Sequence, residues 1–390
     1  RLNLFDSCHI DLLILNFLDL LAERRCLLLL LGLVSPTALA LDEETAAQAA
    51  QTQSEAFGFD DLERIGEAYT GQEDIAGGVD VPGAFRHVGQ TAKDNLGQVV
   101  KTAVRSCVLL LAVTLLWGLA QGMQAGAGES GGLEAITLAA VLAITAVAVG
   151  DVHSLLSLGE EAIYNMETLG DVLLPAVSMA TAASGSPAMA VVKHGATILF
   201  SDFLLRLIHS LLIPLCYAFV AANVAWAALA NEGLKRLAGF LKWLITMVLS
   251  VVLLVFVGYL NLSGVISGGA DAATVKAAKF TLSNLVPVVG GVISDTAETL
   301  LAGAAILRNA AGVFGMLAVL GICVAPFLNL GAHYLLYKGT AALAATAAGS
   351  GRLTGLIEAL GTAFGLILAM TASCAVLLTV AMVSAVSAVG

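Results

Sequence analysis

The sequence contains few charged residues, and this scarcity excludes most classes of protein. Of its 390 residues, 12% are charged and 58% are hydrophobic, whereas roughly 25% of the residues in an ordinary soluble domain are charged. The mean hydropathy is +0.92. Lysine and arginine together number 18 and form no basic patch, so nucleic-acid binding, which needs positive charge against phosphates, is not expected. A multi-pass membrane protein is the class that fits.

Cysteine is also scarce, and its placement argues against disulfides and metal sites. Two of the six cysteines precede a predicted cleavage point and the other four lie in apolar runs: Cys8 and Cys26, then Cys107, Cys216, Cys323 and Cys374. No C-x-x-C pair is present, which removes the usual zinc and redox motifs. The segment predicted to be exported contains no cysteine, so a disulfide framework is not expected.

Motifs of common enzyme classes are absent as well. The chain has no H-E-x-x-H, no P-loop and no G-x-S-x-G. Histidines occur singly, without a partner at metal-ligand spacing, and are expected at the membrane interface: His153, His194, His209 and His333. We therefore expect neither an enzyme nor a cofactor or metal site.

The first feature that is present is a segment typical of secretion. Arg24-Arg25 is followed by the Leu-rich stretch 26–34 and by Ala38-Leu39-Ala40. A basic start, a short apolar middle and an A-x-A ending form a cleavable signal peptide, which is predicted at residues 24–40. Residues 1–23 are interpreted as an upstream extension, with an amphipathic leader as the alternative.

Residues 41–100 are predicted to form an acidic, exported segment. They contain twelve acidic and three basic residues, and so hold nine of the eleven net negative charges. Apolar residues in its first part are too few for an independent core, since Phe57-Gly58-Phe59, Leu62, Ile65 and Tyr69 give only a short helical stripe. We expect a small helical segment that packs on the membrane part or on a partner.

Residues 101–390 are predicted to form a helical transmembrane domain. Eight apolar stretches are candidates when compared with the roughly 20 residues of a bilayer crossing. They are Val104–Met123, Leu133–Val149, Val172–Val192, Ile198–Leu229, Trp243–Leu260, Leu285–Leu307, Ala311–Tyr337 and Leu356–Val389. The predicted fold class is all-α, a polytopic membrane protein with about six to eight transmembrane or re-entrant helices after the signal peptide.

The orientation of these helices follows from one basic loop. Lys235, Arg236 and Lys242 are predicted to face the cytoplasm by the positive-inside rule. An exported N-terminus then requires an odd number of crossings before this loop, yet four apolar stretches precede it. The stretch Val172–Val192, interrupted by Pro175, is therefore predicted to be re-entrant or interfacial.

Two charged residues near the start of an apolar stretch form the first candidate site. Asp202 and Arg206 are four residues apart, so on a helix they share a face and pair. Ionisable groups inside a membrane span are costly and often mark an ion path or a contact with a partner. The alternative is a pair at the membrane interface whose side chains extend toward water.

A glycine-rich region forms the second candidate site. Glycines allow sharp turns and close helix contacts, and irregular backbone at membrane depth is tolerated only where it is buried in protein or faces water. We predict an assembly or pore-lining re-entrant element, with a flexible surface hairpin as the alternative. Its candidate residues are Gly264, Gly268, Gly269, Asp271, Lys276, Lys279, Asn284, Pro287, Gly290, Gly291 and Asp295.

Glycines four residues apart also recur elsewhere in the chain. Examples are Gly118 and Gly122, Gly351 and Gly355, and Gly361 and Gly365. This spacing favours close helix packing, which we expect to occur within the bundle.

A long combination of polar and glycine positions distinguishes residues 263–315. It comprises Ser263-Gly264-Val265-Ile266-Ser267-Gly268, Ala270-Asp271, Val275-Lys276-Ala277-Ala278-Lys279-Phe280, Ser283-Asn284, Val286-Pro287-Val288-Val289-Gly290-Gly291, Ser294-Asp295, Leu307-Arg308-Asn309, Gly312, Phe314 and Gly315. In these positions the chain resembles the stage III sporulation protein AE family of endospore-forming bacteria. The likeness extends from about Phe57 to the C-terminus, and residues 1–23 lie outside it.

The resemblance implies a protein of the mother-cell membrane that surrounds the forespore. It implies membership of a complex, similar to a specialised secretion system, that links the two cells and supports forespore development. The implied partners are other stage III sporulation membrane proteins, the lipid bilayer and a separate cytoplasmic ATPase. We therefore interpret the chain as an integral subunit of that channel complex. The alternative is a secondary transporter of a small solute or ion, with Asp202, Arg206, Asp295 and Glu298 as binding residues, although no internal repeat is found.

Overall fold

Helices make up the regular structure of the described part of the chain, which confirms the all-α class. The computed structural model describes residues 69–71, 79–125, 130–183, 202–266, 290–349 and 351–386. Its long helices are α5 (Val81–Ala125), α6 (Ser130–Ala183), α9 (Ile213–Leu229), α10 (Glu232–Ile266), α12 (Gly290–Ala348) and α13 (Arg352–Val386). The predicted signal peptide, the upstream extension and residues 41–68 of the acidic segment lie outside the described residues.

Six helical segments in the described residues are long and apolar enough to cross a membrane. They are Val81–Met123, Glu134–Val177, Asp202–Leu229, Glu232–Phe256, Asn309–Ala347 and Arg352–Met382. Each exceeds the roughly 20 residues that a hydrocarbon core of about 30 Å requires. The chain is therefore a helical membrane protein by length and composition.

Helix α6 differs from the prediction at Pro175. We expected separate elements at Leu133–Val149 and Val172–Val192, but one helix, Ser130–Ala183, runs through the proline. Proline removes one backbone hydrogen bond, yet helices in membranes tolerate it where neighbouring groups satisfy the freed carbonyl. Residues 184–192 lie outside the described ranges. With α6 counted once, the described residues contain three crossings before the basic loop, which is the odd number that the predicted orientation requires.

Helix α5 begins well before the change in composition at residue 101. Pro82 lies in its first turn, where a fixed φ favours helix and no N–H is needed. Asp80 caps this end, because its Oδ1 accepts a hydrogen bond from the Gly83 N–H at 3.0 Å. The polar residues 81–103 and the apolar stretch Val104–Met123 therefore belong to one continuous helix.

The third crossing, Asp202–Leu229, contains a short π-helix at Ile208–Leu212. There the Ile213 N–H donates to the Ile208 carbonyl, five residues back. Pro214 follows at once, and its ring and missing N–H disturb the normal α-helical pairing. The wider π turn accommodates the proline without ending the helix.

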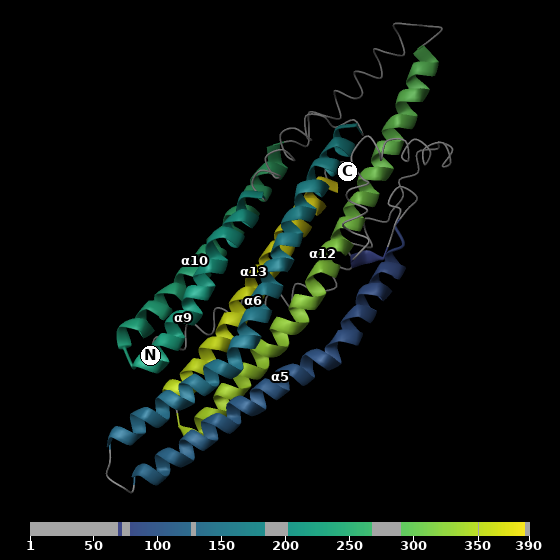
Figure 1. Ribbon diagram of the computed structural model, residues 1–390. Helices are drawn as coiled ribbons and strands as arrows, with labels where there is room; N and C mark the ends of the chain where they lie inside the picture. The colour runs from purple at the N-terminus through teal and green to yellow at the C-terminus, as the bar shows by residue number, and fades with distance from the viewer. Residues whose placement is uncertain are drawn as a thin grey trace.

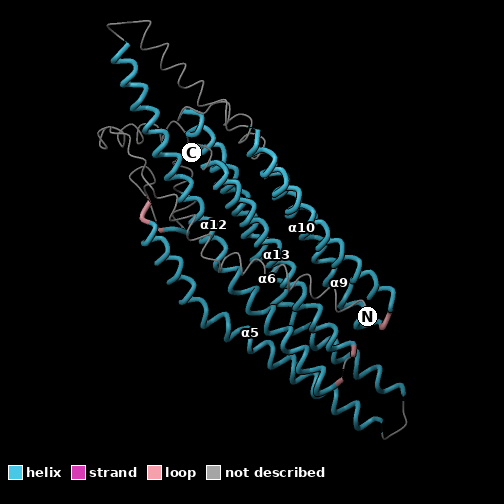
Figure 2. The backbone as a smooth tube through the Cα atoms, turned by 180° about the vertical axis from the view of Figure 1, so that it is seen from behind, coloured by secondary structure: helices cyan, strands magenta, loops and turns pink. Residues whose placement is uncertain are grey.

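The six crossings form three antiparallel hairpins (Figure 1). The ends at which α5 meets α6, α9 meets α10 and α12 meets α13 all lie at the lower end of the bundle in this view. Ala230 makes the turn between α9 and α10 in a left-handed conformation with φ of 54°. Figures 1 and 2 agree that α5 and α10 are on opposite outer sides, with α6, α12 and α13 between them.

Helix α13 forms the centre of the bundle. It contacts α5, α6, α9, α10 and α12. In its most apolar stretch of 18 residues, 83% is buried inside the bundle, whereas the corresponding share is 22% for both α5 and α10. A Cβ added to Gly355 would lie 2.8 Å from the Trp226 ring, and one added to Gly365 would lie 2.8 Å from Tyr334. The prediction that spaced glycines allow close packing within the bundle is confirmed for these two positions.

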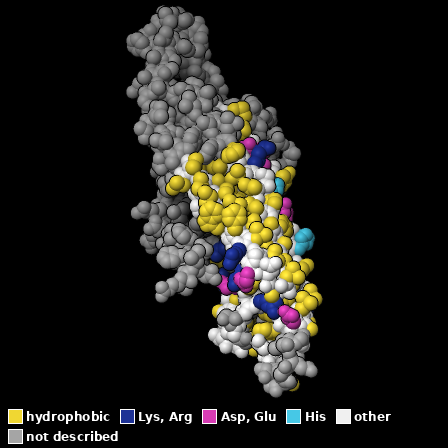
Figure 3. Space-filling model, turned by 90° about the vertical axis from the view of Figure 1, so that its left-hand side faces the viewer, with side chains coloured by type: hydrophobic (Ala, Val, Ile, Leu, Met, Phe, Trp, Pro, Cys, Tyr) yellow, Lys and Arg dark blue, Asp and Glu magenta, His cyan; other side chains and the backbone are white. Residues whose placement is uncertain are grey.

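The outer face of α10 is covered by apolar side chains. Figure 3 shows hydrophobic side chains gathered over the middle of this face, with Lys and Arg side chains beyond them on both sides. The exposed large residues of α10 are Leu237, Phe240, Trp243, Met247, Val251, Leu254 and Val255. Contiguous apolar surface of this kind is rare on soluble monomers and suits contact with lipid tails.

Candidate functional site

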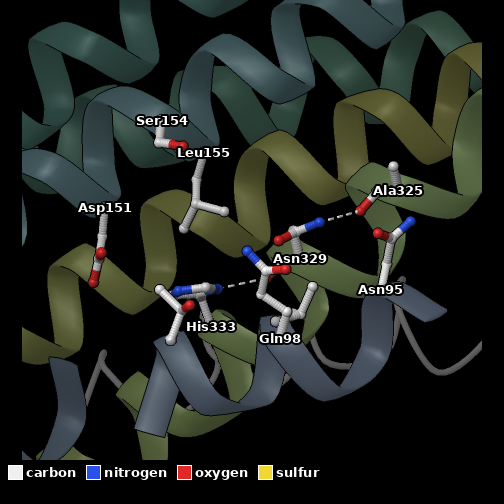
Figure 4. Close-up of a pocket in the computed structure, with 10 residues that line it drawn as sticks. Asn95, Gln98, Asp151, Ser154, Leu155, Ala325, Asn329 and His333 are labelled. Atoms are coloured by element: carbon white, nitrogen blue, oxygen red, sulfur yellow. Dashed lines mark hydrogen bonds between the residues drawn. The ribbon is translucent and has the colours of Figure 1, made fainter. Parts of the chain in front are cut away.

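A polar cleft opens between α5, α6 and α12, within three of the segments long enough to cross a membrane. Its volume is about 290 Å³. Seven of its lining side chains are polar: Asn95, Gln98 and Thr102 from α5, Asp151 and Ser154 from α6, and Asn329 and His333 from α12. Figure 4 shows these helices meeting around the cleft, with the α6 and α12 side chains facing those of α5. Polar groups that converge between the helices of a membrane protein are commonly functional.

Asp151 joins α6 to α12 at one end of the cleft. The Tyr337 hydroxyl donates a hydrogen bond to Asp151 Oδ2 at 2.7 Å. Tyr337 is fully buried, and its ring packs edge-on against Phe364 of α13, with centroids 5.0 Å apart. The tyrosine therefore fixes the position of the carboxylate, since its own ring is held by the central helix.

Helix α12 presents an amide and an imidazole one turn apart. Asn329 Nδ2 donates to the Ala325 carbonyl at 2.9 Å, and His333 Nδ1 lies 2.8 Å from the Asn329 carbonyl. A carbonyl only accepts, so in the neutral ring Nδ1 carries the proton and Nε2 is an acceptor. His333 is 3% exposed. His333 is therefore buried inside the bundle, and its expected position at the membrane interface stays a prediction.

Residues 69–71 pack on the same three helices, farther toward the N-terminal end of α5. Asn165 Nδ2 of α6 donates to the Tyr69 hydroxyl at 2.8 Å. On α12, a Cβ at Gly321 would lie 2.8 Å from the Tyr69 carbonyl oxygen, so only glycine admits this backbone. Burial, and then the nearby Glu161 carboxylate, raises the pKa of Tyr69, so its phenol stays protonated at neutral pH. The predicted packing of the apolar stripe on the membrane part is observed for Tyr69.

The predicted Asp202–Arg206 pair forms, and it belongs to a larger charged cluster. Arg206 Nε lies 2.7 Å from Asp202 Oδ1 and 3.8 Å from Glu167 Oε1. His209, one turn later, lies 3.5 Å from Glu167 Oε2 and 3.8 Å from Glu160 Oε1. The two glutamates come from α6, so the sequence spacing that revealed the pair does not reveal them.

This charged cluster lies at the surface of the bundle. The Arg206 side chain is 61% exposed, whereas that of Glu167 is 12% exposed. From Arg206 to Leu229 the helix rises about 34 Å at 1.5 Å per residue, which is close to the thickness of a hydrocarbon core. The position agrees with the interfacial alternative for this pair.

Most residues of the glycine-rich candidate region lie outside the described residues. These are Gly268, Gly269, Asp271, Lys276, Lys279, Asn284 and Pro287. Gly264 belongs to α10, and Gly290, Gly291 and Asp295 belong to α12, of which the structure describes only the helical backbone here. The re-entrant element and its alternative, the surface hairpin, both stay predictions.

Sequence reasoning missed the cleft, although two signals point to it. Asp151 follows directly after an apolar run that ends near Val149, and Asn329 and His333 stand four residues apart in an otherwise apolar stretch. Neither signal shows that α5 contributes the opposite wall. In the part of the chain that the structure describes, no group of three or more His, Cys, Asp or Glu side chains is arranged to hold a metal ion.

Comparisons with known proteins address the helical bundle as a whole. The curated Stage III sporulation protein AE of Bacillus subtilis (strain 168) is 24% identical over 197 residues, which are 50% of this chain and 49% of that protein. The chain thus aligns with about half the length of this relative, and no solved structure matches. The family model described as stage III sporulation protein AE matches residues 74–389, a range that contains all six crossings. On that match, the chain belongs to the stage III sporulation protein AE family.

Proposed function

We propose that this protein is an integral membrane subunit of the sporulation-specific secretion or channel complex that links mother cell and forespore. The observation that carries the proposal is the family match, because it covers all six crossings found in the described residues. In this proposal the protein resides in the mother-cell membrane around the forespore and is needed for forespore development. Its partners are other stage III sporulation membrane proteins and a separate cytoplasmic ATPase, in keeping with a sequence that has no P-loop.

The bundle suits the role of a rigid platform within such a complex. The central helix α13 contacts the other crossings, and the second half of α5 and the middle of α10 expose apolar side chains such as Leu116, Leu119 and Leu254. A platform of this kind holds partners at fixed positions in the bilayer and needs no catalytic group of its own.

Affinity capture from sporulating cells tests the proposal. The tagged full chain is solubilised in mild detergent and its partners are identified by mass spectrometry, with tagged protein from vegetative cells as the control. We expect co-purification of other stage III membrane proteins and an ATPase from sporulating cells only. We also expect a deletion strain to arrest forespore development and the full chain to restore it. Normal spores from the deletion strain would refute the role.

A second candidate function is a secondary transporter of a small solute or ion. One observation favours it: a polar cleft lies between three helices that are long and apolar enough to cross a membrane, and transporters bind substrates between such helices. The pair Asp202 and Arg206, first considered for this role, does not line the cleft. Solute-dependent uptake into liposomes that contain only this protein would favour the transporter over the complex subunit.

A further inference from the structure

The hydrogen-bond donors on the α12 side of the cleft are used within the protein. The Asn329 amide donates to the Ala325 carbonyl, and the His333 Nδ1 proton faces the Asn329 carbonyl. The Tyr337 hydroxyl donates to Asp151. These bonds, at 2.7 to 2.9 Å, use one N–H of Asn329, the His333 Nδ1 proton and the Tyr337 hydroxyl proton.

The acceptors of the same residues are left to face the cleft. The Asn329 side-chain oxygen, the His333 Nε2 atom of the neutral ring and the second oxygen of Asp151 are not used by those bonds. From the opposite wall, Asn95 and Gln98 bring amide groups whose oxygens are acceptors and whose N–H groups are donors, and Ser154 adds a hydroxyl beside Asp151. Figure 4 shows the α5 amides across the cleft from Asn329 and His333. The cleft is therefore rich in acceptors.

The charge of the cleft points to the charge of its occupant. Asp151 is the single carboxylate among the lining residues, and no Lys or Arg lines the cleft. A half-buried carboxylate is costly unless it is paired with a positive charge. One hydrogen bond from a neutral tyrosine leaves this charge without a counter-ion.

The size and ligand set of the cleft favour a small monovalent cation. A space of about 290 Å³ holds such a cation together with several water molecules, each of which occupies about 30 Å³. Calcium takes six to eight oxygens, several of them from carboxylates, and zinc takes sulfur or several histidines. One carboxylate among amides and hydroxyls does not meet either requirement.

We propose that the α5–α6–α12 cleft binds a small monovalent cation, either a hydrated alkali ion or a protonated primary amine, with Asp151 as its counter-charge. Asn329, His333 and the α5 amides supply neutral acceptors around it. This site does not depend on the sporulation role, because binding is a property of the single chain and is measured on purified protein.

Thermal unfolding of the purified full chain in detergent tests the site. The buffer cation is N-methylglucamine, a much bulkier cation than the small ions to be tested, and sodium, potassium, ammonium or methylammonium chloride is added. A ligand that binds only the folded state raises Tm with its concentration. We expect a saturable rise for one or more of the small cations and none for added N-methylglucamine chloride. The sodium and potassium salts test for an alkali ion, and the ammonium and methylammonium salts test for a protonated amine.

Three variants make the test specific to Asp151. Asp151→Asn keeps an acceptor for Tyr337 but removes the charge, so the apparent Kd is expected to rise at least about ten-fold. Asp94→Asn, the matched control, removes an exposed carboxylate of α5 that does not line the cleft, and should leave the Kd unchanged. Gln98→Glu adds a second charge at the exposed rim and should lower the Kd.

Two results would overturn the proposal. One is a wild-type Tm that responds equally to small cations and to N-methylglucamine. The other is an Asp151→Asn variant with the wild-type Kd. Should Asp151→Asn fail to fold, the Gln98→Glu variant still decides, because an unchanged Kd in that variant contradicts a cation site.

Discussion

At the scale of single residues, the surroundings decide what the same residue type does. His209 and His333 look alike in the sequence, since each is a lone histidine in an apolar stretch. In the structure His209 lies partly exposed between Glu160 and Glu167, whereas His333 is buried beside a polar cleft. The residues that distinguish them are distant in sequence, so a single sequence cannot predict the difference.

The Asp202–Arg206 pair was predictable, because its spacing of four depends only on helix geometry. We expect Asp202→Asn to leave sporulation and the yield of folded protein close to wild type. The reason is that Arg206 extends into the exposed surface, and exposed ion pairs contribute little to stability. Spore counts and the Tm of the purified variant measure this.

A glutamate of α6 provides the comparison for that prediction. Glu167 is more buried than Asp202 and faces both Arg206 and His209. Replacing Glu167 by Gln should therefore lower Tm more than Asp202→Asn does. Complete loss of sporulation in Asp202→Asn, with normal folding, would instead show that the pair acts in the mechanism.

At the scale of elements, apolar runs predicted helices well but not their boundaries. The run Val104–Met123 was recognised, yet α5 starts at Val81, because a capping aspartate and Pro82 begin a helix whose first half is polar. Pro175 was expected to interrupt the chain, but α6 continues through it. Composition marks where a helix meets lipid, whereas caps and neighbouring helices decide where it begins and ends.

The glycines of α13 give a prediction about packing between elements. Replacing Gly365 by Leu should destabilise the bundle by about 1–3 kcal/mol, the usual cost of overpacking, because even a Cβ there would lie 2.8 Å from Tyr334. Gly122→Leu is the matched control, since nothing lies within 4 Å of its added Cβ. Thermal unfolding in detergent measures both. Equal Tm values for the two variants would show that α12 and α13 separate easily.

At the scale of the whole molecule, the hairpin arrangement makes a prediction about sidedness. Gly89 near the start of α5 and Asn231 in the α9–α10 turn lie at opposite ends of the bundle (Figure 1). Lys235 and Arg236 stand next to that turn, so the positive-inside rule puts it in the cytoplasm. Gly89→Cys should therefore react from outside and Asn231→Cys from inside.

A membrane-impermeant thiol reagent, applied to right-side-out and inverted vesicles, measures this sidedness. The background chain carries Ser at positions 8 and 26, and its four described cysteines are buried: Cys107, Cys216, Cys323 and Cys374. Labelling of both engineered positions from the same side would contradict three crossings between them. The sequence alone gives four apolar stretches before the basic loop, whereas the described residues contain three crossings there.

The central position of α13 has a consequence for how the protein is made. Of the six crossings, α13 is the last to be translated, yet it contacts both the α9–α10 hairpin and the group of α5, α6 and α12. Apart from a smaller contact between α6 and the third crossing, the α9–α10 hairpin therefore depends on α13 for its attachment to the other helices. A chain that ends before Arg352 would keep the contacts among α5, α6 and α12 but would lose most of those that attach the α9–α10 hairpin.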